Sequence, residues 1–315
     1  MSSLLLALLV SLPVDPLAPG RPSVLRGHTD AVTALAFSPD GGTLASASRD
    51  ASIRLWSLES GAEKSAIAGD KSATNAIAFS PDGTTLATGT VELQVRLLDL
   101  TTGAIKRVIA FPDAVMELAF SPDGTLVVVS GPSGLTTLFT VADGKQRPFN
   151  LRGRSAKFSG DGKTLALGLP GGGITLVDSA TGKTKKSIAT PNHAPMITFS
   201  ADGKTLATWS AKDRAIRLWS AVTGKSLGAL SLPAAKDPFE NAPPTTLSAL
   251  ALSASGALAV SVSADLHLRV WDVEKKSVLV TYPLEREGAV ALSPDASQVA
   301  VADGAQIKIW PTRPH

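Results

Sequence analysis

The stretch "FSPDG" occurs at residues 37–41, 79–83 and 120–124, and this repetition decides the fold. Weaker copies follow as "FSGDG" from Phe158, "FSADG" from Phe199, "LSASG" from Leu252 and "LSPDA" from Leu292. Successive serines of the seven copies lie 42, 41, 38, 41, 53 and 40 residues apart. A period of about 40 residues is typical of proteins built from one repeated supersecondary unit.

A second motif recurs in step with the first. Its copies are "IRLW" (53–56), "VRLL" (95–98), "TTLF" (136–139), "ITLV" (174–177), "IRLW" (216–219), "LRVW" (268–271) and "IKIW" (307–310). Each unit predicts four short strands, which in the first unit cover 32–37, 43–48, 53–56 and 64–69. Ser-Pro-Asp-Gly fits a type I turn, with proline at its second position. Seven such units predict an all-β, seven-bladed β-propeller with four-stranded antiparallel blades.

The N-terminal stretch "PSVLRGH" (22–28) resembles the end of a repeat whose beginning is absent. Outer strands are predicted after the glycine turns at 63–69, 105–110, 145–151, 183–190, 225–232 and 277–284, so one blade of seven lacks its own. We expect residues 22–27 to pair with 307–310, which completes the last blade and closes the ring. Deletion of residues 1–20 should then be tolerated, whereas deletion of 1–28 should be strongly destabilising.

The spacing of 53 residues contains a proline-rich loop insertion, "PAAKDPFENAPP" at 233–244. It is not an eighth blade, because a further unit would lengthen the spacing to about 80 residues. We therefore expect a single propeller domain at 21–315, preceded by an apolar segment at 1–20. In that segment "LLLALLVSL" (4–12) has the length of a signal-peptide core, but no basic residue precedes it. An exported protein, periplasmic or extracellular, and a cytoplasmic protein are both left open.

Composition excludes several classes of function. The net charge of +3 is small for 315 residues, so no nucleic-acid partner is expected. The absence of cysteine excludes disulfides, zinc–thiolate sites and thiol catalysis. The apolar N-terminal run is shorter than the roughly 20 residues that a transmembrane helix needs, so no membrane span is expected. We expect a monomeric propeller.

The chain resembles the WD-repeat family of seven-bladed β-propellers over residues 22–310. The first unit matches the family pattern in full, with Gly27 before a set of four polar or aromatic residues, His28, Ser46, Asp50 and Trp56. The resemblance implies that these four side chains form a hydrogen-bonded tetrad inside the blade. Units five and six keep parts of the set: Thr208, Asp213 and Trp219, and Ser261, Asp265 and Trp271. The family also implies a protein-interaction scaffold.

Trp209 stands in the second predicted strand of the fifth unit, where other units have Ala47 or Gly89. One interpretation is that its ring fills a gap between neighbouring blades. The other is that it forms a ligand platform, in the manner of aromatic residues at interfaces.

No catalytic, cofactor-binding or metal-binding residue is expected. The four histidines, at 28, 193, 267 and 315, do not have the spacing of metal ligands. "GPSG" (131–134) is not a nucleophile elbow, and "PGGG" (170–173) lacks the lysine and helix of a phosphate loop. A non-catalytic scaffold is therefore the main hypothesis. The alternatives are a propeller enzyme of hydrolase or lactonase type and a propeller that binds a small molecule or a glycan.

Function is expected on one face of the propeller, which we name the top face. It is formed by the loops that enter each first strand and the turns that follow each second strand. The opposite face carries the repeated SPDG and TG turns and varies little, whereas loops on a rigid scaffold commonly carry binding. The candidate residues for binding a protein or peptide partner are Arg49, Lys71, Arg152, Arg154, Lys212, Arg214, Asp237, Phe239, Glu240 and Asn241.

Overall fold

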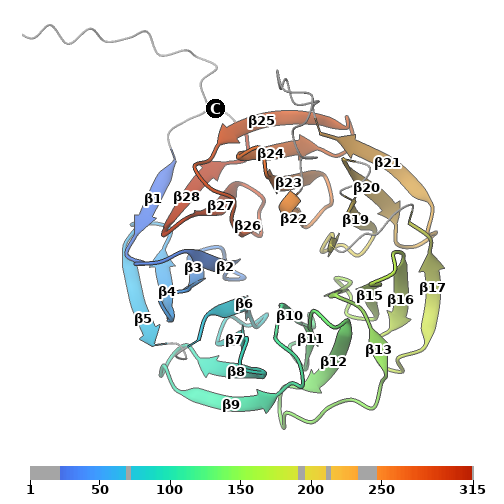
Figure 1. The fold of residues 1–315 in the computed structure, drawn as a ribbon, viewed down its shortest axis with the longest axis horizontal. Coiled ribbons are helices and arrows are strands. Elements are labelled where there is room, and N and C mark those ends of the chain that lie inside the picture. Colours follow the sequence, from blue (N-terminus) through green and yellow to red (C-terminus); the bar gives the residue numbers. More distant parts are fainter. Residues whose placement is uncertain (1–21, 69–71, 191–195, 211–213, 233–246, 314–315) are drawn as a thin grey trace, which may run out of the picture.

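The computed structural model describes residues 22–68, 72–190, 196–210, 214–232 and 247–313. In these residues the protein is all-β, with 28 strands in seven sheets arranged as a ring (Figure 1). Each sheet has four antiparallel strands, so the seven-bladed β-propeller predicted from the repeats is confirmed. Over these same ranges, no helix is long and apolar enough to cross a membrane.

The blades, numbered 1 to 7 from β2, share one strand order from the channel outwards. The first strands are β2 (Val32–Phe37), β6 (Thr74–Phe79), β10 (Glu117–Phe120), β14 (Ser155–Phe158), β18 (Met196–Phe199), β22 (Leu247–Leu252) and β26 (Val290–Leu292). The second strands are β3 (Thr43–Ser48), β7 (Thr85–Thr90), β11 (Leu126–Ser130), β15 (Thr164–Gly168), β19 (Thr205–Ser210), β23 (Leu258–Ser263) and β27 (Gln298–Asp303). The third strands are β4 (Ser52–Ser57), β8 (Gln94–Asp99), β12 (Leu135–Thr140), β16 (Ile174–Asp178), β20 (Ala215–Ser220), β24 (His267–Asp272) and β28 (Gln306–Pro311). The outer strands are β5 (Glu63–Ala68), β9 (Ile105–Ala110), β13 (Leu151–Arg152), β17 (Thr184–Ile188), β21 (Ser226–Ser231), β25 (Ser277–Pro283) and, in blade 7, β1 (Ser23–Arg26).

The ring closes in blade 7, where the sheet order is β1-β28-β27-β26. β1 runs antiparallel to β28, with Ser23 opposite Ile309 and Arg26 opposite Gln306. Figure 1 shows the blue and red ends of the chain side by side in this blade. The closing strand predicted at 22–27 is therefore confirmed. It leaves the last blade with four strands like the others.

The Ser-Pro-Asp-Gly sequence forms the tight turn between the first and second strands. In blade 1 the Gly41 N–H donates to the Ser38 carbonyl at 2.9 Å, and Gly41 has a φ of 71°. Glycine adopts this left-handed conformation without a steric penalty, which explains why the motif ends in glycine. The Ser38 N–H donates to the Thr43 carbonyl at 2.8 Å, so the turn leads directly into the ladder between β2 and β3.

Seven clusters of buried side chains form the core, one at each interface between neighbouring blades. Each cluster contains the residue that ends the second sequence motif, packed against the preceding blade: Trp56, Leu98, Phe139, Val177, Trp219, Trp271 and Trp310. The core is therefore a ring of sheet-on-sheet contacts. Trp209 is 2% exposed and packs with Leu247 of blade 6, which confirms the interpretation that it fills a gap between blades.

Blade 3 departs from the strand predicted at 145–151. Its outer strand β13 has two residues, preceded by an isolated bridge between Phe139 and Gln146. Pro148 has no N–H to donate to the ladder, which explains the interruption. The neighbouring Phe149 packs into the cluster between blades 3 and 4. The insertion predicted at 233–244 and the segment 1–20 lie outside the described residues.

Candidate functional site

Four side chains of blade 1 form a continuous hydrogen-bonded tetrad. The His28 imidazole lies between two partners, with Nδ1 2.9 Å from Asp50 Oδ2 and Nε2 2.7 Å from Ser46 Oγ. The Trp56 indole donates to the same Ser46 oxygen at 2.8 Å. With its proton on Nδ1, His28 donates to Asp50 and accepts from the Ser46 hydroxyl, so every polar atom of the tetrad has a partner. The tetrad ties the loop that enters β2 to the turn between β3 and β4.

The surroundings of the tetrad favour a neutral His28 and an ionised Asp50. Burial lowers the pKa of His28 below its ordinary value of 6.5, and this outweighs the opposing hydrogen bond to Asp50. Burial works to raise the pKa of Asp50, but hydrogen bonds from the Ser52 hydroxyl, the Thr29 N–H and His28 outweigh it. The pKa of Asp50 is therefore well below its ordinary value of 3.8. Because Ser46 is fully buried and accepts the Trp56 indole, the arrangement supports the structure of the blade.

In blade 6 an arginine binds the aspartate that corresponds to Asp50. The guanidinium Nη1 of Arg269 donates to the Ser263 hydroxyl at 2.7 Å and to Asp265 at 3.1 Å, and Nη2 also contacts Asp265. Burial works to raise the pKa of Asp265, but the hydrogen bonds from Arg269 and Ser263 outweigh it, so this pKa is lowered. The Trp271 indole donates to Ser261 at 2.9 Å. The tryptophan–serine hydrogen bond of the blade 1 tetrad therefore recurs here, while the aspartate binds an arginine.

In blade 7 a lysine has the corresponding role. Lys308 Nζ lies 2.5 Å from Asp303 and 3.2 Å from Glu285, and Asp303 also accepts the Arg286 N–H at 2.7 Å. Burial works to lower the pKa of Lys308, but the two carboxylates outweigh it and the pKa is raised. The sequence analysis missed Lys308 and its counterpart in blade 6. The available signal was the basic residue two positions before tryptophan in "LRVW" and "IKIW".

The acids of the SPDG-type turns are engaged within their own turns. Their serine hydroxyls donate to the aspartate two residues later at 2.5–2.6 Å, in the pairs Ser38–Asp40, Ser80–Asp82, Ser121–Asp123, Ser159–Asp161, Ser200–Asp202 and Ser293–Asp295. In Asp40 the Ser38 hydroxyl and the Gly42 N–H lower the pKa of the carboxyl group. These carboxylates stabilise turns. The face that they form is chemically uniform.

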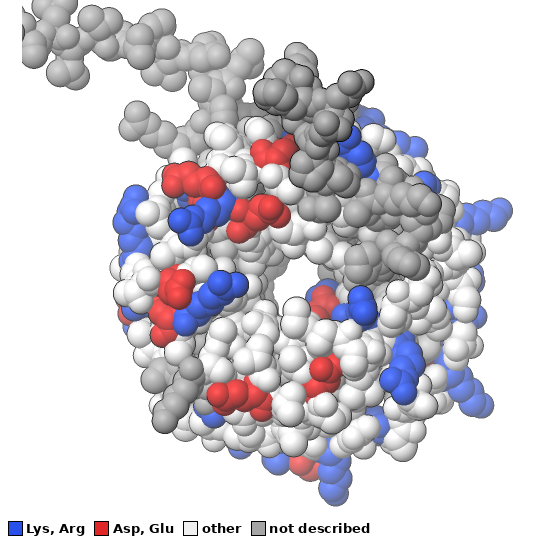
Figure 2. Space-filling view, in the orientation of Figure 1, with Lys and Arg blue, Asp and Glu red and all other residues white. Residues whose placement is uncertain are grey.

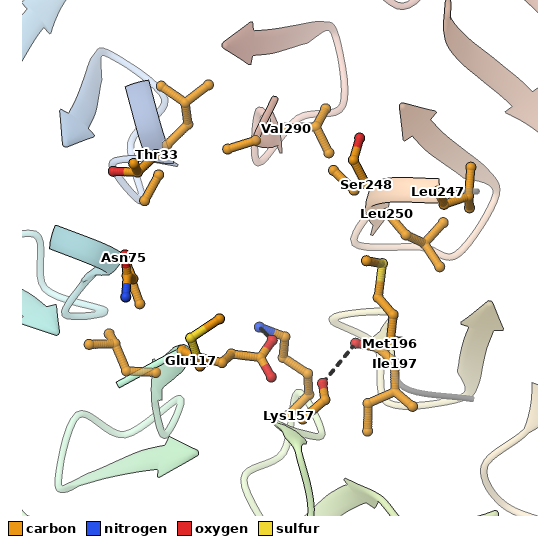
Figure 3. A pocket seen from close by; sticks show the side chains of 18 of the residues that line it. Thr33, Asn75, Glu117, Lys157, Met196, Ile197, Leu247, Ser248, Leu250 and Val290 are labelled. Carbon is orange, nitrogen blue, oxygen red and sulfur yellow. Dashed lines mark hydrogen bonds and ion pairs between the residues drawn. The ribbon is translucent and has the colours of Figure 1, made fainter. Parts of the chain in front are cut away.

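The first strands surround a central cavity of about 720 Å³. Figure 2 shows it as an opening with charged side chains of both signs around it, and Figure 3 shows Thr33, Asn75, Glu117 and Lys157 at its wall. Glu117 is the single acid among its described lining residues, and its carboxylate lies 2.5 Å from Lys157 Nζ. The carboxylate also accepts the Ala156 N–H at 3.0 Å. Glu117 therefore joins blade 3 to blade 4.

Three exposed apolar side chains lie on the top face, in segments of blades 2 and 3 that backbone hydrogen bonds join. Val91 and Leu93, in the turn between β7 and β8, are 48% and 49% exposed, and Met116, in the loop that enters β10, is 51% exposed. The turn and the loop are joined by backbone hydrogen bonds from Phe111 N–H to Leu93 O at 2.8 Å and from Val115 N–H to Thr90 O at 3.0 Å. Met116 also lines the central cavity. We name Val91, Leu93 and Met116 the apolar patch.

Three stretches of the chain match the family model of the WD domain, G-beta repeat, at residues 21–57, 63–99 and 241–272. The first stretch contains all four residues of the tetrad, and the repeats form seven closed blades. The chain carries WD repeats and folds as a seven-bladed β-propeller. A search of curated proteins finds no sequence that matches it.

In this WD-repeat propeller the structure describes four of the ten residues predicted to bind a partner. Arg49, Arg152 and Arg154 are exposed and Arg214 is half-buried. Arg49, Arg154 and Arg214 lie in loops or turns, whereas Arg152, predicted in a loop, ends strand β13. The other six, Lys71, Lys212, Asp237, Phe239, Glu240 and Asn241, lie outside the described residues. The apolar patch was missed by the sequence analysis, because an apolar residue in a short turn looks like the end of a strand.

WD-repeat propellers are typically not catalytic. The lactonase-type alternative needs a cluster of acids that holds a metal ion in the channel. Among the described residues no group of three or more histidine, aspartate and glutamate side chains is placed to hold one.

Proposed function

We propose that the protein is a non-catalytic scaffold that binds a protein partner through its top face. The observation that carries the proposal is the apolar patch, Val91, Leu93 and Met116, of which Met116 also lines the central cavity. Exposed apolar residues that gather within one surface mark interaction sites more often than scattered ones do. Flexible methionine side chains adapt well to a partner's surface.

Charged residues on the same face would form the polar rim of the interface. Arg49, Arg152 and Arg154 are exposed on the top face, and arginine is enriched in protein interfaces. We extend the proposed site to Arg214 and to the predicted residues of the neighbouring loops: Lys71, Lys212, Asp237, Phe239, Glu240 and Asn241. An interface with the apolar patch at its centre and arginines at its rim favours a partner that presents an apolar side chain between acidic residues.

The opposite face supports the proposal by contrast. Its SPDG aspartates are engaged by serines within the turns, as described above, and they offer no varied surface. It does carry one strongly exposed apolar residue, Val222, in a TG turn, with 71% of its side chain accessible. Val222 therefore provides a matched control on the same propeller.

The experiment compares affinity capture from native lysate by four purified proteins. They are the wild type, the double variant Leu93→Glu with Met116→Glu, the single variant Val222→Glu, and a variant without residues 234–243. We expect proteins captured by the wild type to be retained by Val222→Glu and lost with the double variant, because two carboxylates would be buried in the apolar centre. The deletion variant tests whether the insertion contributes.

Thermal midpoints of the four proteins decide whether a loss of capture is a loss of folding. Leu93, Met116 and Val222 are exposed, and residues 234–243 are predicted to form a loop, so each midpoint should stay close to that of the wild type. Equal capture by the wild type and the double variant, or equal loss with Val222→Glu, would show that the partner does not bind this face.

A further inference from the structure

The seven interfaces between blades are filled by residues at one repeated position. This position ends the second sequence motif and holds tryptophan in blades 1, 5, 6 and 7, phenylalanine in blade 3, Val177 in blade 4 and Leu98 in blade 2. An aliphatic side chain is smaller than an indole, so blades 2 and 4 each lack volume at this position. The two blades differ in how the volume is replaced.

In blade 4 another aromatic ring replaces the missing volume. Phe149, from the segment before β13, packs into the same cluster as Val177. A Cβ atom added to Gly182 would lie 2.7 Å from the Phe149 ring, so the ring closes over the turn of blade 4. This interface is therefore completed within the protein.

In blade 2 no other described side chain fills the space that a tryptophan would occupy at the position of Leu98. A pocket of about 350 Å³ lies between blades 1 and 2. Its described lining includes Leu98, the aliphatic side chains Ile53, Ile67 and Ile105, and the buried residue Thr88. The polar residues Thr74, Thr90 and Arg96 also line it. No aromatic side chain belongs to the described lining. The volume is at the lower end of the range for small-molecule sites, about 300–1,000 Å³.

The outer edge of the pocket differs from the same place in blade 1, although Arg96, which corresponds to Arg54, also lines the pocket. In blade 1, Arg54 pairs with Glu63, and both lie against Gly27 together with the Trp56 ring. In blade 2, Ile105 stands at the position of Glu63, seven residues after the end of the second motif. Ile105 is 50% exposed and lines the pocket. A ligand would therefore enter past an aliphatic side chain.

The Thr88 hydroxyl can accept a hydrogen bond from a ligand in this pocket. In three other blades the tryptophan indole N–H donates to the hydroxyl at the equivalent position: Trp56 to Ser46 at 2.8 Å, Trp219 to Thr208 at 3.0 Å and Trp271 to Ser261 at 2.9 Å. Thr88 occupies this position in blade 2 and is 2% exposed. Leu98 stands where the indole would be and has no N–H to donate. The pocket thus presents the Thr88 hydroxyl opposite aliphatic side chains, with Thr74, Thr90 and the Arg96 guanidinium elsewhere in its lining.

We infer that the pocket between blades 1 and 2 binds a small planar aromatic molecule with one N–H donor, of which indole is the simplest example. Such a ligand supplies the ring that the other blades carry on their own chain. Its flat body fits between two facing sheets, and its donor satisfies the Thr88 hydroxyl. This side pocket is separate from the apolar patch and does not depend on the proposed scaffold function.

The experiment titrates the full chain with indole and with 1-methylindole, which has the same ring without the donor. Binding is followed by the methyl NMR signals of ¹³C-labelled isoleucine, with Ile53, Ile67 and Ile105 as the reporters at the pocket. We expect these signals to shift first and indole to bind about 2- to 10-fold more tightly than 1-methylindole, the range of one net hydrogen bond. In Thr88→Val the two ligands should bind equally.

Two further variants locate the site. Leu98→Trp places the missing ring on the chain and should reduce indole binding more than about tenfold, the expected result of steric exclusion. If this variant does not fold, Ile67→Phe fills the same space from the opposite wall. Thr208→Val, which removes the equivalent hydroxyl in blade 5 where Trp219 already occupies the gap, is the matched control and should bind indole like the wild type.

The inference is overturned if the three isoleucine signals do not respond to indole. It is equally overturned if the pocket-filling variants bind indole as well as the wild type does, or if the preference for indole over 1-methylindole persists in Thr88→Val.

Discussion

The buried imidazole of His28 shows how one residue links the family pattern to the stability of a blade. Its two nitrogens join Asp50 to Ser46, and this requires a neutral ring with one donor and one acceptor. A second proton on the ring would turn the acceptor into a donor, and the Ser46 oxygen would then face two donors, the imidazolium and the Trp56 indole. The blade is therefore built for pH values at which His28 is uncharged.

Acid is expected to destabilise the protein through His28. The pKa of His28 is lowered in the folded state, so its stabilisation is complete above about pH 6.5 and is lost as the pH falls below that value. Asp50, whose folded pKa is also lowered, adds a further loss below about pH 3.8. Urea unfolding midpoints of the wild type should decrease between pH 7.5 and pH 5, and His28→Gln should be less stable but flatter over this range.

His267→Gln is the matched control for this measurement, because its ring lies on the same face of the propeller but is 41% exposed. This variant should keep the pH dependence of the wild type. A His28→Gln protein with the same slope as the wild type would assign the pH dependence to another group.

At the scale of elements, β1 carries more stability than its four residues suggest. Its Leu25 side chain is buried in the cluster between blades 7 and 1, together with Trp56 and Ile307. The strand also covers β28, which would otherwise be an exposed edge. A short strand at this place is therefore part of two structures, the ladder of blade 7 and the core of the next interface.

Truncation should separate β1 from the segment before it. Removal of residues 1–20 should leave the unfolding free energy nearly unchanged. Removal of 1–27 keeps His28 but deletes Leu25 and the ladder to β28, and it should cost about 2–5 kcal/mol, the range for loss of a buried leucine and its packing. Urea denaturation of the two proteins checks this. Equal midpoints would contradict the closure by β1.

At the scale of the whole molecule, each blade packs only on its two neighbours, as in other repeat proteins. The interface between blades 7 and 1 differs, because both chain ends meet in one sheet (Figure 1). To open the ring there, the β1–β28 ladder must break as well as the side-chain packing. We expect this ladder to slow unfolding of the whole propeller.

Circular permutation tests this role without removing any strand. One permutant begins at His28, and a short linker joins residue 313 to residue 22, so that β1 follows β28 and all of blade 7 lies at one chain end. It should unfold about tenfold faster than the native order, equivalent to roughly 1.4 kcal/mol, because opening then breaks side-chain contacts alone. Stopped-flow unfolding in urea measures the rates.

A second permutant with the same linker, opened between Gly182 and Lys183, is the control. Its first strand is β17, which pairs with β16 from the other chain end. Blade 4 of this permutant therefore contains strands from both chain ends, as blade 7 does in the native order. This protein should unfold at nearly the native rate. Equal rates for both permutants would show that the place of the chain ends does not affect ring opening.

One part of the candidate site could be predicted from the sequence, and the other part could be found only in the structure. Loop position alone predicted that Arg49, Arg152 and Arg154 would lie on the top face, because antiparallel strands of known order alternate between two faces. The apolar patch could not be predicted in this way. Its members, Leu93 and Met116, come from a turn and a loop of different blades, and backbone hydrogen bonds bring these segments together.

The repeat, the blade count and the closing strand could be predicted from the spacing of two short motifs, and the tetrad from the resemblance of the first unit to the WD-repeat family. How each interface between blades is filled could be seen only in the folded ring. Val177 and Leu98 look equivalent in the sequence, yet Phe149 completes one interface and the other keeps a pocket. The physical reason is that packing volume is set by side chains from neighbouring blades, about 40 residues apart, whose contacts no local pattern records.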